Sequence, residues 1–469
     1  MRDRDETVLA VVEAGLAAVV VLAPLPFGAV RGWGRDALEW TAFALLAIAV
    51  FGLRPRVGAL PSKALLAASL GLLAVGAVQI APLPGAAAAA LSPETARVRA
   101  ATVPPAEAAA EEARLLGVPP AELDPAPRLS VSPRSSAAAL RTGAAALALA
   151  ISACAVAARR PPWWFGPAAL VSAGFQALYG LLVLASRHDR IWNVPKTHYL
   201  DCATGTFINR NHFASFLAMA LAVGVAALLA AGHRARRHAP TATPFSWTDA
   251  HGIALLAGAG LAVLGLAGLL LSFSRAGTAL GGGAILWVML LGAPLVTRRR
   301  WALAAGTALI AAIPLAALGF ARLAGRYGEA FADLSTPGGR MDVWIDTVRM
   351  AAAFPVAGTG FGTFGEIYPS FRSPAVRLFY DHAHNDWLQA VAEGGIVAAA
   401  LLIVGVAAIA PRLVRGLAGR YGTAAIGLAA AVVVAALHAL VDFPMRIPAL
   451  AAFVAVALGV LEGEACRQR

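Results

Sequence analysis

Residues 211–231 of this 469-residue chain read NHFASFLAMALAVGVAALLAA, an apolar run without one charged side chain. A helix of about 17–25 such residues spans the hydrocarbon core of a bilayer. Eleven further apolar runs lie before and after it, so the sequence predicts an all-α polytopic membrane protein with about twelve transmembrane helices. We expect the spans at Thr7–Ala23, Ala37–Leu53, Lys63–Ile80, Ala137–Ala157, Gly166–Ala185, Asn211–Ala231, His251–Leu271, Ala276–Val296, Trp301–Phe320, Asp386–Ala410, Thr423–Val441 and Ile447–Leu461.

The composition excludes the other broad classes of protein. Hydrophobic residues make up 59% of the chain and charged residues 14%, with a mean hydropathy of +0.71. Soluble domains carry about 45–50% apolar and about 25% charged residues. A net charge of +12 would suggest nucleic acid in a soluble protein, but here it reflects loops kept in the cytoplasm, so we expect no nucleic-acid partner. The three cysteines have no CxxC spacing, which argues against a zinc site or a disulfide framework.

The basic residues predict the orientation. With the N-terminus inside, 18 of the 38 basic residues fall on the inner side and 8 in short outer loops. The other 12 lie in two long outer segments, and long segments translocate largely regardless of charge. Because short cytoplasmic loops carry an excess of Lys and Arg, we expect both termini in the cytoplasm. The first apolar run lacks a small-residue cleavage site, so we expect it to be retained.

The spans divide the chain into three parts. Residues 1–320 hold the first nine helices and an outer loop at 81–136, which is rich in Pro and Ala and has a short helix predicted around 106–116. Residues 321–384 form a large outer loop of less repetitive sequence, and residues 385–469 hold the last three helices. Loops of this second kind, placed between scaffold elements, often carry function.

A short amphipathic helix is predicted in the large loop. Met341, Trp344, Ile345 and Val348 recur at helical spacing, and charged residues occupy the rest of the turn. A helix with this pattern is typical of the membrane interface.

The densest polar cluster on the outer face is YDHAHNDWLQ, at residues 380–389, which leads into the tenth span. His382 and His384 are candidate general bases, because a histidine that is neutral near pH 7 can take a proton from a hydroxyl. The alternative is that both histidines only anchor the chain at the membrane interface, and the two aspartates beside them argue against it. The neighbours that are candidates to fix the histidine tautomer are Asp381, Asn385 and Asp386.

Three outer-face arginines form a candidate anion site. Arg210 begins the sixth span, where the helix N-terminus adds partial positive charge. Arg275 lies in the narrow polar turn between the seventh and eighth spans, and Arg340 opens the amphipathic helix. Arginine matches phosphate oxygens in two-point geometry. The alternatives are side chains that snorkel to lipid headgroups or, for Arg340, a solvated charge at a helix end.

On the predicted outer face, no pair of carboxylates is evident that could hold a divalent cation. The first outer loop has a lone aspartate, and Asp3 and Asp5 lie on the cytoplasmic side. We therefore expect a metal-free site in which arginines replace the cation, and no cofactor.

These motifs resemble a known family. NRNHFA at 209–214, SFSRAG at 272–277, Gly339-Arg340, GTGFG at 358–362 and HAHNDWL at 382–388 are similar to segments of the O-antigen ligase and polysaccharide polymerase family (Wzy_C) of bacterial envelope glycosyltransferases. The twelve-span layout and the large loop after the ninth span match as well. The resemblance is best from about residue 206 to residue 395, and the first 200 residues match only in topology.

The resemblance implies a fold related to the GT-C glycosyltransferases and a polyprenyl-diphosphate-linked glycan as donor. In such enzymes arginines hold the diphosphate and a loop histidine activates the acceptor hydroxyl. Carried over to this chain, Arg210 and Arg275 bind the diphosphate, with Arg340 as a further member. His384, which precedes an asparagine, is the preferred base, and His382 is the reserve.

The predicted function is transfer of a glycan from undecaprenyl diphosphate, or a similar carrier, to an acceptor hydroxyl on the periplasmic side of the inner membrane. The acceptor stays open: lipid A-core for a ligase of lipopolysaccharide biosynthesis, a growing glycan for a polymerase, or a protein for an O-oligosaccharyltransferase. A twelve-helix secondary transporter is the alternative from another class. Transporters place polar residues at mid-membrane in both halves of a repeat, whereas here we find no convincing repeat and the polar residues gather at one face. A structural or assembly role without catalysis is a third possibility.

Overall fold

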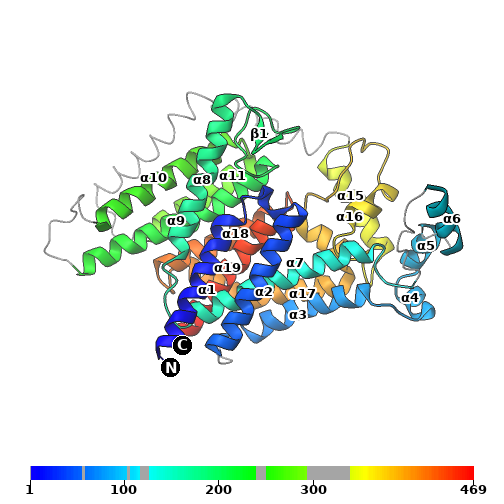
Figure 1. The fold of residues 1–469 in the computed structure, drawn as a ribbon, viewed down its shortest axis with the longest axis horizontal. Coiled ribbons are helices and arrows are strands. Elements are labelled where there is room, and N and C mark those ends of the chain that lie inside the picture. Colours follow the sequence, from blue (N-terminus) through cyan, green and yellow to red (C-terminus); the bar gives the residue numbers. More distant parts are fainter. Residues whose placement is uncertain are drawn as a thin grey trace. The chain divides into compact units, whose positions relative to one another are not determined.

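The computed structural model describes residues 2–54, 59–102, 106–116, 126–238, 250–292 and 338–468 (Figure 1). Within these ranges the chain is almost entirely helical, and one two-stranded antiparallel hairpin is present, β1 (Arg190–Ile191) with β2 (Val194–Pro195). The expected span at 301–320, and residues 321–337 of the large loop, lie outside the described residues. The other eleven expected spans all coincide with helices.

Nine helices of the described ranges are long and apolar enough to cross a membrane. They confirm a polytopic helical membrane protein, while the total of twelve stays a prediction. Two expected spans fall outside the nine: α1 (Arg2–Leu22), which includes Asp5, Glu6 and Glu13, and α18 (Thr423–His438), which has 16 residues. The nine run over Gly32–Leu53, Lys63–Ile80, Pro133–Ala157, Phe165–Ser186, Arg210–Ala235, Ala250–Leu271, Arg275–Gly292, Asp386–Leu417 and Pro448–Arg467.

The chain forms two compact units, and two helices, α7 (Pro133–Ala157) and α17 (Asp386–Leu417), have residues in both. The first unit takes the described residues up to Ser62, from Ala145 to Gly292 and from Ala408 onward. Besides α1, the hairpin, α18 and parts of α7 and α17, its helices are η1 (Phe27–Ala29), α2 (Gly32–Ile48), η2 (Ala49–Leu53), α8 (Phe165–Ser186), α9 (Arg210–His238), α10 (Ala250–Leu271), α11 (Arg275–Gly292), η5 (Pro444–Arg446) and α19 (Pro448–Arg467).

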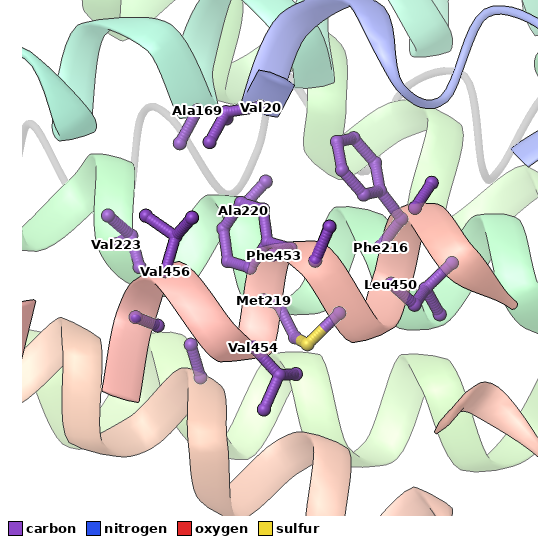
Figure 2. Packing of buried hydrophobic residues seen from close by; sticks show 14 of the residues in the cluster. Val20, Ala169, Phe216, Met219, Ala220, Val223, Leu450, Phe453, Val454 and Val456 are labelled. Carbon is purple, nitrogen blue, oxygen red and sulfur yellow. The ribbon is translucent and has the colours of Figure 1, made fainter. Parts of the chain in front are cut away.

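Helix α9 lies at the centre of the first unit, in contact with α8, α10, α11 and α18. Every residue from His212 to Gly224 is buried, as expected for a helix that is apolar on all sides. Figure 2 shows Phe216, Met219 and Val223 of α9 packed with Phe453 and other apolar side chains of α19. The Phe216 and Phe453 rings meet edge to face with centroids 5.7 Å apart. Such contacts hold helices together where lipid provides no hydrophobic driving force.

Glycines set the register between α9 and α11. A Cβ on Gly277 would lie 2.4 Å from the Cβ of Ala214, and a Cβ on Gly281 would lie 2.9 Å from the Cβ of Ala218. Both pairs have the same difference in residue number, so the two helices run parallel, with their backbones in close approach. Parallel helices present their N-termini at the same end.

Helix α18 runs the opposite way beside them. Gly292, at the end of α11, lies against Thr423 at the start of α18, and Gly427 lies against the backbone of Ala222 near the middle of α9. The end of α18 and the residues that follow it therefore meet the N-terminal end of α9.

The second unit comprises Lys63–Ala144 and the described residues from 338 to Ala407. Its core is formed by Val343, Met350, Phe354, Phe364, Ile367, Tyr368, Val376, Ala383 and Ala392. Besides parts of α7 and α17, its helices are α3 (Lys63–Ile80), α4 (Gly85–Leu91), α5 (Pro93–Thr102), α6 (Ala106–Leu116), α15 (Arg340–Ala353), α16 (Phe364–Ile367) and η4 (Tyr368–Ser370). Both helices predicted within the outer loops are present, as α6 and α15.

Candidate functional site

The two arginines predicted at span ends lie at the same end of the first unit. Arg210 is the first residue of α9, and Arg275 is the first residue of α11. In the register set by the glycines, Arg275 is level with His212, two residues from Arg210. Two residues correspond to about 3 Å along a helix axis. The parallel packing therefore places the first residues of both helices, each an arginine, at one end of the unit together with the positive ends of two helix dipoles.

Polar caps fix both helix starts. The side-chain oxygen of Asn209 accepts a hydrogen bond from the backbone N–H of Asn211 at 2.8 Å. The hydroxyl of Ser274 accepts one from the N–H of Gly277 at 3.3 Å, and the buried Phe273 before it has a left-handed φ of 52°. Side-chain caps of this kind satisfy N–H groups that have no partner inside the helix.

Arg210 is half-buried, and its guanidinium carbon lies 5.2 Å from the centroid of the Tyr199 ring. An aromatic face holds a cation without neutralising it, so the guanidinium keeps its charge for an anion. Arg275 is half-buried as well.

A buried His–Asp pair begins two residues along α9 from the first of these arginines, at His212. The Nε2 of His212 is 3.8 Å from a carboxylate oxygen of Asp442, and the two side chains are only 6% and 2% exposed. The ring of Phe443 meets the imidazole edge to face at 4.6 Å, and the N–H of Phe443 donates to Asp442 at 2.9 Å. Neither His212 nor Asp442 was predicted from the sequence as a site residue, although His212 belongs to the NRNH motif.

The third predicted arginine belongs to the second unit. Arg340 is the first residue of α15, and the turn before it is held by the N–H of Gly338, which donates to Asp342 at 2.6 Å. The apolar stripe of this helix, at Met341, Ile345 and Val348, is exposed. The predicted amphipathic helix is therefore confirmed, and its place in the membrane interface stays a prediction.

The opposite face of α15 is buried and partly polar. Asp346 is 1% exposed and accepts hydrogen bonds from the hydroxyl of Tyr368 at 3.3 Å and the N–H of Ser373 at 2.9 Å. Arg349 also donates to it, at 3.1 Å. Burial, together with the nearby Asp346 carboxylate, raises the pKa of Tyr368. Tyr368 therefore stays protonated and keeps the loop attached to α15.

The histidine segment leads directly into α17. Asn385 caps this helix, because its side-chain oxygen accepts the N–H of Leu388 at 3.0 Å. Asp386 is buried in the first turn, where a carboxylate suits the helix dipole, and Asp381 is exposed. His382 and His384 are both half-buried. In the structure Asn385 fixes the start of α17. That Asp381, Asn385 or Asp386 also fixes the tautomer of a histidine stays a prediction.

The backbone of Ala383, between the two histidines, is held at both its N–H and its carbonyl. The indole N–H of Trp344, from α15, donates to the carbonyl of Ala383 at 3.0 Å, and the N–H of Ala383 donates to the side-chain oxygen of Gln389 at 3.0 Å. His384 has a left-handed φ of 51°, and its ring meets that of Tyr380 edge to face at 5.7 Å. A non-glycine residue in this conformation costs about 1–3 kcal/mol and persists only where its surroundings enforce it.

A buried network of side chains supports His382. The side-chain nitrogen of Gln389 lies 3.2 Å from Nδ1 of His382 and donates to a carboxylate oxygen of Glu393 at 2.8 Å. Glu393 also accepts the N–H of Gly362 at 2.9 Å and the N–H of Phe364 at 3.2 Å. Gln389 and Glu393 are both fully buried, one turn apart on α17.

The GTGFG motif forms the loop that supplies those N–H donors. Gly358, Gly360 and Gly362 all have positive φ, at 66°, 105° and 78°. Gln79 of α3 holds the loop, because its side-chain nitrogen donates to the carbonyls of Ala357 at 2.7 Å and Glu393 at 2.9 Å. Its side-chain oxygen accepts the N–H of Phe361 at 3.0 Å. The glycines are needed because their conformations are unfavourable for other residues.

Across the described ranges, no group of three or more His, Cys, Asp or Glu residues is arranged to hold a metal ion. The charged groups gathered at the N-termini of α9 and α11 are cationic, which favours an anionic ligand there.

The family model for O-antigen ligase, Wzy_C, matches residues 260–403. This match confirms the resemblance predicted from the motifs over this part of the chain. It spans the second half of α10, α11, α15, α16 and most of α17. Of the predicted site residues, only Arg210 lies outside it. No curated protein matches the chain.

The match broadly supports an O-antigen ligase or polymerase type of function, and the apolar helices fit a multi-pass membrane protein. The roles of Gln79, Gln389 and Glu393 in the network, and of Trp344 as a hydrogen-bond donor, were not predicted from the sequence. The one available signal was the spacing of Gln389 and Glu393, four residues apart and therefore on one face of α17.

Proposed function

We propose that this protein is a glycosyltransferase of the O-antigen ligase type. It transfers a glycan from a polyprenyl diphosphate to an acceptor hydroxyl on the periplasmic side of the inner membrane. The observation that carries the proposal is the pair Arg210 and Arg275, at the N-termini of two parallel packed helices. An arginine pair with two helix dipoles suits a ligand with at least two negative charges, such as a diphosphate.

The chemistry needs a base and a stabilised leaving group. His384 takes the proton of the acceptor hydroxyl as its oxygen forms a bond to the anomeric carbon of the donor sugar. The bond from that carbon to the diphosphate oxygen breaks, and the electron pair leaves with the polyprenyl diphosphate. Arg210 and Arg275 stabilise the negative charge that develops on this group, with Arg340 as a further contributor. Direct attack inverts the anomeric configuration, and no metal ion is required.

The anion site is tested by replacing Arg275. A strain deleted for the gene is complemented with each variant, and the polyprenyl-diphosphate-linked glycan and the finished conjugate are measured in its membranes. With Arg275→Ala, we expect the donor to accumulate and the conjugate to fall at least a hundredfold. Arg275→Lys restores transfer only partly, because an ammonium cannot grip a phosphate at two points. Arg210→Ala behaves like Arg275→Ala, and Arg340→Ala is milder.

The matched control is Arg190→Ala, which removes an exposed arginine of the β1–β2 hairpin and should leave transfer unchanged. All variants are compared at equal protein level in the membrane. Full transfer by a well-expressed Arg275→Ala protein would make this arginine a lipid anchor and remove the basis of the proposal. The nature of the conjugate that disappears distinguishes a lipid A-core acceptor from a growing glycan or a protein.

A further inference from the structure

The hydrogen bonds around Gln389 determine which atoms of its amide face which neighbour. The backbone N–H of Ala383 lies 3.0 Å from one amide atom of Gln389, and a backbone N–H can only donate. That atom must therefore be the oxygen, and the other, which faces Glu393 and His382, must be the NH₂ group.

The same reasoning fixes the direction of the hydrogen bonds at Glu393. Its two carboxyl oxygens accept from the N–H groups of Gly362 and Phe364 and from Gln389. The NH₂ group of Gln389 has two hydrogens and can only donate. One hydrogen of the Gln389 amide therefore points at Glu393, and the second is directed to Nδ1 of His382, 3.2 Å away.

From this network we infer that Gln389 and Glu393 hold His382 as the neutral tautomer protonated on Nε2. In that tautomer the Nδ1 lone pair is engaged by Gln389 and Nε2 carries the proton, so no lone pair is left to take a proton from an acceptor hydroxyl. His382 then serves the reaction as a hydrogen-bond donor to a substrate oxygen, with no proton transferred. Gln389 and Glu393 are positioning residues that act through it.

The inference rests on the proposed function and separates the two histidines within it. The hydrogen bond from Gln389 goes to His382, whereas the ring of His384 is oriented by the enforced left-handed backbone and by Tyr380. Of the two histidines, His384 is therefore the base. A glutamine can replace a histidine that only donates a hydrogen bond, because its amide is also a donor, but it cannot replace a base.

The test compares His382→Gln with His384→Gln. Each variant is expressed in the deletion strain, and membrane vesicles that carry both native substrates are prepared from those cells. The rate of conjugate formation is then measured in the vesicles. We expect His382→Gln to stay within about tenfold of wild type, and His384→Gln to fall by about a hundred- to ten-thousand-fold, the range typical of a lost general base. Added imidazole should restore part of the activity of His384→Ala and none of that of His382→Ala.

The role of Gln389 is tested by a double-mutant cycle. Gln389→Met keeps the size of the side chain and removes the donor, and we expect the rate to fall about tenfold. If Gln389 acts through the tautomer of His382, the same change made in the His382→Gln protein should have little further effect. A purely structural role would lower the rate by the same factor in both backgrounds. Protein level and thermal stability are measured for each variant.

The outcomes separate the inference from the function on which it rests. If vesicles with the wild-type protein form no conjugate, the proposed function fails. If the wild type is active and His382→Gln loses as much activity as His384→Gln, only the inference is overturned. Additive effects in the double-mutant cycle would likewise overturn the positioning role of Gln389.

Discussion

The kink in α17 offers a sharp test of how the histidine network is built. Gly395 has φ 67° and ψ −167°, a conformation that only glycine adopts readily. A Cβ at this position would lie 2.2 Å from the carbonyl oxygen of Val356, a backbone atom that has little room to move. The kink is held by the N–H of Ile396, which donates to the carbonyl of Pro355 at 2.9 Å.

For Gly395→Ala, the backbone conformation costs about 1–3 kcal/mol and the forced displacement of a packed segment about 1–3 kcal/mol more. We expect a loss of about 3 kcal/mol in the free energy of unfolding, together with reduced transfer. Transfer should fall because the carbonyl of Glu393, two residues earlier, accepts from Gln79 and from Gly360. Displacement of this turn moves the carboxylate that holds Gln389.

The matched control lies on the same helix. At Gly405 a Cβ would be 3.7 Å from the nearest atom, a methyl group of Ala68, which is an ordinary contact. Gly405→Ala should be neutral or stabilise by up to about 1 kcal/mol, because alanine favours helix over glycine. Both variants are unfolded in mixed micelles with increasing SDS, and transfer is measured in vesicles. If Gly395→Ala unfolds at the wild-type midpoint and transfers glycan at the wild-type rate, the kink does not determine the geometry of the network.

Three further predictions concern the metal, the topology and the placement of α15. Conjugate formation by the purified protein should survive EDTA, because the proposed site relies on arginines, and strict loss of activity with rescue by magnesium or manganese would reveal a metal site that we missed. In a cysteine-free background, Ser370→Cys, at an exposed position beside the buried Tyr368, should react with a membrane-impermeant reagent from the periplasmic side, and labelling from the cytoplasm alone would overturn the predicted orientation. A spin label at Ile345 should report the depth of the bilayer interface if the exposed face of α15 rests on lipid, whereas a label fully accessible to water-soluble quenchers would exclude that placement.

Much of the architecture could be predicted from local sequence. Long apolar runs fix where helices occur, because in a bilayer only a helix satisfies the backbone of an isolated span. The spans at Lys63–Ile80 and His251–Leu271 therefore agree with α3 and α10 to within one residue. The short helix at Ala106–Leu116 and the amphipathic helix that begins at Arg340 were equally readable.

The site residues were predicted by type, and the network behind them was not. A histidine pair and arginines at span ends stand out because charged and titratable groups are costly near hydrocarbon. Gln79 and Glu393 do not stand out, since a single amide or carboxylate in a long chain has no pattern of its own. The contact of the Gln79 side chain with the carbonyl of Glu393 joins two residues more than 300 positions apart.

The sequence by itself determined that this is a helical membrane protein, which segments form its helices and which residue types are available for chemistry. Only the tertiary structure decided that Arg210 and Arg275 share one end of parallel helices, and that Gln389 faces both His382 and Glu393. The physical reason is that spans apolar on every side carry little record of which face meets which neighbour. That choice is made by close contacts of small residues, such as Gly277 against Ala214, and by hydrogen bonds that exist only once the helices have packed.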